Sequence, residues 1–97
     1  MDEKKYAAFS HAWFDPWENE EISREYRLAK PERADVNRFN KEVQKSASTA
    51  QQNLVVSLIH PDDKAACLAD LERWPGLFLT LASGLLKASG LSGDLGN

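Results

Sequence analysis

Two histidines and one cysteine are the side chains of this sequence best suited to acid–base or nucleophilic chemistry. His60 comes shortly before Asp62 and Asp63, so an imidazole–carboxylate pair could act as a general acid–base group. We favour the alternative that His60 ends a helix, where its partial positive charge complements the helix dipole. His11 lies in an aromatic segment, and neither histidine has a second ligand at a metal-binding helical spacing. The pattern therefore predicts no catalytic residues, no metal site and no cofactor.

Cys67 is the single cysteine, which excludes an internal disulfide and a cysteine-cluster metal site. Acidic residues at 62, 63 and 70 are its neighbours in sequence, and no basic residue shares its expected helical face. Nothing there lowers the pKa of the thiol, so we expect a small buried apolar side chain rather than a nucleophile. The glycines at 90, 93 and 96 lack the preceding strand and following helix that a phosphate-binding loop requires.

Aromatic side chains are the best candidates for binding another protein. Six of the nine aromatic residues lie within residues 1–30. Among them, Trp13, Phe14 and Trp17 are large, rigid side chains of the kind that dominates protein interfaces. Covering the helical core is the other interpretation of these residues. The two are compatible, because alternate residues of a hairpin face opposite ways.

Net charge argues against a nucleic-acid partner. The chain carries a formal charge of -3, whereas nucleic-acid-binding domains are usually strongly basic. Arg38, Lys41 and Lys45 line one side of an expected helix and could contact phosphates. Acidic residues at 32, 35 and 42 flank them, which favours a solvated face. No apolar run approaches the roughly 20 residues of a bilayer span, and no signal peptide is visible, so we expect a cytoplasmic protein without a membrane partner.

A hairpin and four helices are expected to position these residues. Ile22, Tyr26 and Leu28 alternate with polar residues, and Arg24 is the one break on the apolar side, so a strand is predicted over 22–29. It is expected to pair with residues 12–17. Helices are predicted over 31–46, 49–59, 61–74 and 76–89, with prolines at 31, 61 and 75 marking their limits.

The predicted fold class is α+β, mainly α: a short N-terminal β-hairpin followed by a compact four-helix body. Residues 1–90 form a single domain in this interpretation, with an aromatic hairpin segment over 1–30 and a helical body over 31–90. Residues 91–97 are expected to be a flexible tail. The core is expected to contain Leu54, Leu58, Leu68, Leu71, Leu81 and Leu85.

The last helix is unusually apolar. Its leucines, with Phe78 and Ala82, sweep about 200° of arc, whereas a surface helix needs only about 100°. Leu79 and Leu86 lie at the edges of this arc, so we expect both to face outward. With Trp17, they would contribute to a homo-oligomer interface or to a groove that binds a helix of a partner.

Two stretches of the chain resemble small phage and prophage proteins of the tail-assembly-chaperone type. One, residues 26–39, carries a Lys-Pro-x-Arg-x-Asp signature at 30–35, and the other covers residues 52–64 and 68–77. The resemblance implies an intracellular, non-enzymatic protein that keeps a tape-measure protein soluble and helps tail-tube subunits assemble around it. The first 17 residues fall outside the pattern. The alternative function is that of a small helical DNA-binding regulator.

Overall fold

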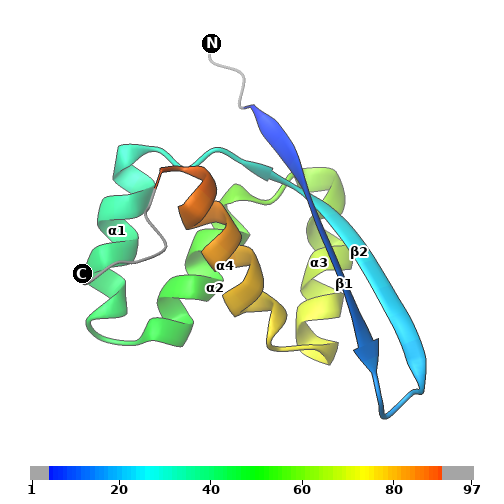
Figure 1. Cartoon of the computed structure of the whole chain (residues 1–97). Coiled ribbons are helices and arrows are strands. Elements are labelled where there is room, and N and C mark those ends of the chain that lie inside the picture. Colours follow the sequence, from blue (N-terminus) through cyan, green and yellow to red (C-terminus); the bar gives the residue numbers. More distant parts are fainter. Residues whose placement is uncertain (1–4, 91–97) are drawn as a thin grey trace.

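The computed structural model describes residues 5–90 (Figure 1). Within that range the chain forms an antiparallel hairpin of β1 (Tyr6–Asp15) and β2 (Glu20–Ala29). The helices α1 (Arg33–Val43), α2 (Ala47–Leu58), α3 (Pro61–Arg73) and α4 (Leu77–Ala88) follow. The predicted fold class is therefore confirmed. The tail expected over 91–97 lies outside the described residues.

The hairpin is longer than predicted. Its register runs without interruption from Tyr6 opposite Ala29 to Asp15 opposite Glu20, so β1 begins six residues before the expected position 12. β1 has alanines at 7, 8 and 12, on both faces of the strand. Because alanine is small and only weakly apolar, these positions give no clear alternation of apolar and polar residues. Residues 16 and 17, expected in the strand, belong to the turn, which ends at Asn19 with a φ of 54°.

The core lies where β2 and the helices meet. Five of the six leucines expected in the core are buried, but Leu68 is 38% exposed, so its assignment was wrong. The side of α3 that faces β2 carries Asp63, Cys67 and Asp70, and both aspartates bind arginines of that strand. One residue beyond Cys67, Leu68 is rotated about 100° away from this side.

Helix α2 is the central helix, as expected, since it contacts α1, α4 and β2. β2 joins the helical body at the start of α3: Leu28 bridges to Ile59, and the backbone N–H of His60 donates to the carbonyl of Arg27 at 2.9 Å. β1 passes over α4 at Gly84, where a Cβ would lie 3.4 Å from the Phe9 ring. No helix within residues 5–90 has the length and apolar character of a bilayer span.

Candidate protein-binding surface

The five residues expected to bind a partner do not form one patch. Trp13 points inward from β1 and is half-buried, whereas Phe14, on the other face of the strand, is 49% exposed. Trp17 lies in the turn and is 88% exposed. On α4, Leu79 is 57% exposed and faces outward as expected, but Leu86 is half-buried against the core and offers less free surface than expected.

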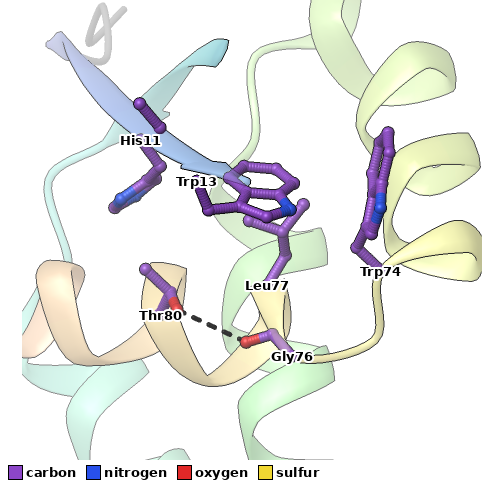
Figure 2. Close-up of a pocket in the computed structure, with 7 residues that line it drawn as sticks. His11, Trp13, Trp74, Gly76, Leu77 and Thr80 are labelled. Carbon is purple, nitrogen blue, oxygen red and sulfur yellow. Dashed lines mark hydrogen bonds between the residues drawn. The ribbon is translucent and has the colours of Figure 1, made fainter. Parts of the chain in front are cut away.

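Two adjoining cavities, which we call the tryptophan groove, lie beside the hairpin and the start of α4. The first has a volume of about 300 Å³ (Figure 2) and is lined by His11, Trp13, Trp74, Gly76, Leu77 and Thr80. The second has a volume of about 440 Å³ and is lined by Asp15, Trp17, Glu18, Arg73, Trp74 and Pro75. All three tryptophans of the chain therefore line this groove.

Trp74 is the fixed element of the groove. Its indole Nε1 donates to Asp15 Oδ2 at 2.9 Å, and the ring of Trp13 meets it edge-on, with 5.3 Å between ring centroids. The guanidinium carbons of Arg24 and Arg73 lie 5.1 and 4.5 Å from its ring centroid, within the range of cation–π attraction. These contacts restrict the ring before any partner arrives, which lowers the entropy cost of binding.

Asp15 holds the turn and Trp74 together. Its carboxylate is buried, and Oδ1 accepts the backbone N–H groups of Trp17 at 3.0 Å and Glu18 at 3.3 Å. The hydrogen bond from Trp74, helped by these backbone donors, holds the pKa of the Asp15 carboxyl below its ordinary value. Sequence reasoning missed this positioning role, although an aspartate directly before Pro16 is a turn signal.

Arg24, the break in the apolar alternation of β2, belongs to the support of the groove. Its Nε donates to Asp70 Oδ2 at 3.0 Å, and the hydroxyl of Tyr26 donates to the same oxygen at 2.8 Å. Burial, together with this bond to the carboxylate, raises the pKa of the Tyr26 phenol. A lone arginine on an apolar strand face was thus a sign of a partly buried acidic partner.

His11 supplies a polar atom to the groove. It points from β1 toward α4 (Figure 2), and its Nε2 is buried without a hydrogen-bond partner among the described residues. Thr80 lies below it and donates its hydroxyl to the carbonyl of Gly76 at 3.4 Å. The groove therefore has mainly aromatic and apolar walls, which suit an apolar segment.

Residues 9–96 match the family described as a domain of unknown function, DUF6848. The chain belongs to this family. The structure of the uncharacterised protein rbstp2171 from Bacillus stearothermophilus is similar to this DUF6848 domain, with a TM-score of 0.72 and 25% sequence identity. The similarity covers 94% of this chain and 88% of that chain. Among curated proteins, no match is found.

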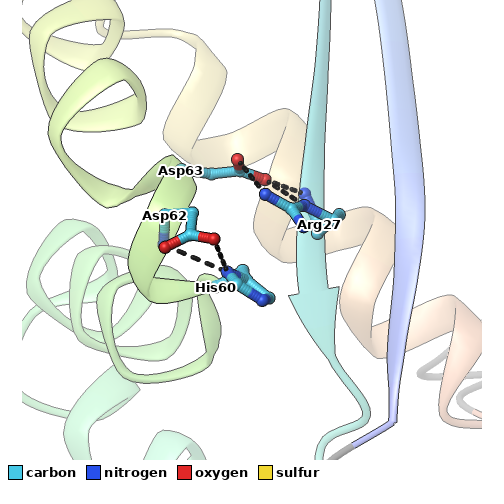
Figure 3. Close-up of polar contacts among 4 residues, drawn as sticks. All are labelled: Arg27, His60, Asp62 and Asp63. Carbon is cyan, nitrogen blue, oxygen red and sulfur yellow. Dashed lines mark hydrogen bonds and ion pairs between the residues drawn. The ribbon is translucent and has the colours of Figure 1, made fainter.

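His60 begins a helix of the DUF6848 domain instead of ending one, which corrects the expected role. Its Nδ1 accepts the backbone N–H of Asp62 at 3.0 Å and so caps α3, as Figure 3 shows. The imidazole thus accepts a hydrogen bond at the start of a helix, whereas the expected role placed its partial positive charge at the end of one. Tyr6 covers the imidazole, with 4.6 Å between ring centroids.

Asp63 binds the backbone of β2 as well as a side chain. Its carboxylate accepts the backbone N–H of Arg27 at 2.9 Å and two guanidinium N–H groups of the same residue (Figure 3). These bonds lower the pKa of Asp63 to about 2. Of the two carboxylates considered as partners of His60, Asp63 is thus bound to Arg27, whereas Asp62 Oδ2 lies 3.9 Å from His60 Nδ1.

Cys67 is buried, and desolvation raises the pKa of its thiol to about 11. That is the expected behaviour of a packing residue and the opposite of an activated thiol. Within residues 5–90, no group of three or more His, Cys, Asp or Glu side chains is placed to hold a metal ion.

The basic residues of α1 are partly engaged. Arg38 donates to Ser57 Oγ at 3.0 Å and lies 3.8 Å from Asp35, whereas Lys41 and Lys45 are exposed. A phosphate would therefore have to displace existing partners of Arg38.

Proposed function

We propose that this DUF6848 domain is a non-enzymatic protein that binds an extended segment of another protein in the tryptophan groove. The observation that carries the proposal is the gathering of all three tryptophans around the fixed ring of Trp74, with Trp17 88% exposed. Tryptophan contributes strongly to binding when a partner covers it, since it buries a large area and loses little side-chain entropy.

The charge beside the groove indicates the chemistry of the partner. Glu18, Glu20 and Glu21 are exposed in and after the turn that carries Trp17. A segment with apolar side chains flanked by lysine or arginine would meet these carboxylates, and its cations could lie on the Trp17 ring.

The resemblance to tail-assembly chaperones supports a phage tail component as the partner, either a tape-measure or a tail-tube protein. Such a chaperone must bind a long partner at more than one place. Leu79 offers a second contact, since it lines a groove of about 380 Å³ with Ser48, Gln51 and Pro75. Neither contact requires a catalytic residue.

The proposal is tested by calorimetric titration of the full chain with purified phage tail-tube and tape-measure proteins. Trp17→Ala should weaken binding by at least about 30-fold, since a central tryptophan in an interface contributes about 2 kcal/mol or more. Val43→Ala on α1 is the matched control, because Val43 is also an exposed apolar residue but lies outside the groove.

Thermal melts of both variants should match the wild-type melt, because both side chains are exposed. If neither tail protein binds, the phage assignment is wrong. If Trp17→Ala binds as tightly as Val43→Ala, the partner does not use the tryptophan groove.

A further inference from the structure

One edge of β1 is free. β1 pairs with β2 on one side, and no described residue pairs with its other side. The outer edge of β2, in contrast, is occupied at Arg27, whose N–H and C=O bind Asp63 and His60. In Figure 3, β2 lies between α3 and β1, so the free edge faces away from α3.

The hydrogen-bond pattern identifies the backbone groups at this edge. Lys30 donates its N–H to the carbonyl of Lys5 at 3.2 Å, so odd-numbered residues of β1 bond to β2. In an antiparallel pair the alternate residues turn their N–H and C=O groups to the other side. Those residues are Tyr6, Ala8, Ser10, Ala12 and Phe14.

Nothing in β1 protects this edge from another strand. Natural edge strands usually carry a proline, a bulge or charged side chains that prevent further pairing. β1 has an unbroken ten-residue register, no proline, and no Lys, Arg, Asp or Glu between Tyr6 and Phe14. Both aromatic residues lie on the outer face: Phe14 is 49% exposed, and Tyr6, whose ring also contacts His60, is 36% exposed.

We propose that a second copy of this chain pairs with the free edge, antiparallel about a two-fold axis at Ser10, to form a four-stranded sheet. In this register Ser10 lies opposite the partner's Ser10, and Ala8 opposite the partner's Ala12. Tyr6 lies opposite the partner's Phe14. Small residues thus meet small ones and aromatic residues meet aromatic ones, with no like charges opposed. The strand is complementary to itself, which favours a second copy over an unrelated segment.

The inner face of the strand fits the same register. Ala7 lies opposite the partner's Trp13, so the smallest side chain of this face meets the largest. The helices leave a cavity of about 300 Å³ below the His11–Trp13 part of β1, and Trp13 is half-buried. This interface uses a strand edge and does not rest on the proposed function of the tryptophan groove.

Charge variants at the edge test the proposal by sedimentation equilibrium of the full chain. One variant carries Ala8→Lys with Ala12→Lys, and the other carries Ala8→Glu with Ala12→Glu. Each alone opposes like charges across the two-fold axis, so the dimer dissociation constant should rise by at least about tenfold. An equimolar mixture opposes lysine to glutamate and should restore the dimer.

The matched control is Ser23→Lys, which adds a lysine to the same sheet face on β2, directly opposite Ala12 within the hairpin. It should leave the dimer unchanged, and circular-dichroism melts should show that all variants fold. A wild-type chain that is monomeric at about 100 μM, far above a micromolar dissociation constant, overturns the proposal. So does a mixture that fails to dimerise, equal loss of the dimer in Ser23→Lys, or a monomer whose edge instead pairs with a tail protein.

Discussion

Replacing Tyr26 by phenylalanine removes one hydroxyl from the partly buried link between β2 and α3. The ring is 3% exposed and stays in place, so the change isolates the 2.8 Å hydrogen bond to Asp70. A hydrogen bond to a charged group contributes about 1.5–3 kcal/mol. Asp70 keeps its 3.0 Å hydrogen bond from Arg24 in this variant. We therefore expect the free energy of unfolding to fall by an amount near the lower end of that range, about 1–2 kcal/mol.

Urea unfolding followed by circular dichroism measures this loss, and the melting temperature should fall by about 5–10 °C. A double-mutant cycle with Asp70→Asn separates the pair from its surroundings, and a coupling of about 1 kcal/mol is expected. A cost below about 0.3 kcal/mol, or additive effects, would show that the hydroxyl is not bound to Asp70 in solution.

Tyr26 also affects the stability of the protein at alkaline pH. The folded protein holds the Tyr26 proton above the ordinary pKa of 10, so above that pH the folded state binds more protons than the unfolded state. Stability must then fall by up to about 1.4 kcal/mol per pH unit. Cys67, with a pKa raised from 9 to about 11, adds a loss of the same sign from pH 9 upward. In a Cys67→Ala background, Tyr26→Phe should remove the remaining slope; an unchanged slope would refute the reasoning.

Leu58→Ala should cost about 2–5 kcal/mol in urea unfolding, whereas Leu68→Ala, at an exposed site, should cost less than about 1 kcal/mol. Gly84→Ala should stabilise the protein by about 0.5–1 kcal/mol, because it improves helix propensity and its Cβ finds an ordinary contact distance of 3.4 Å; a lower melting temperature would disprove this. Asp63 has its pKa lowered from 3.8 to about 2, so it stabilises the fold above pH 3.8 and this contribution is lost as the pH falls toward 2. Asp63→Asn should therefore be less stable at pH 7 and show a flatter acid limb in pH-dependent melts. Fluorescence anisotropy with duplex DNA at physiological salt should show no sub-micromolar binding, and such binding would favour the regulator alternative.

Local patterns in the sequence predicted most elements of the fold. Prolines and apolar periodicity located the four helices, and period-two alternation located β2. The misassigned residue Leu68 shows that local patterns carry no information about contacts between residues far apart in the chain. An apolar residue on a helix looks like core, but α3 instead turns Asp63 and Asp70 toward β2 because arginines 36 and 46 residues earlier in the chain bind them.

The candidate site was predictable only in part, for the same reason. Aromatic content identified Trp13 and Trp17, but the ring that brings them together is Trp74. Its partner Asp15 is 59 residues away in sequence. A hydrogen bond between side chains so far apart leaves no periodic signal, and it becomes visible only when the topology places the turn beside the end of α3.

The polar links along α3 also affect how the chain folds. Asp63, Asp70 and Trp74 follow one side of the helix, and each binds a different point of the hairpin. A two-stranded hairpin is barely stable alone, and these links close loops of 36 to 59 residues. Because each link pairs the hairpin with α3, we expect the hairpin to dock after this helix has formed. Transient opening would release all three tryptophans together, so the groove exists only while the hairpin is docked.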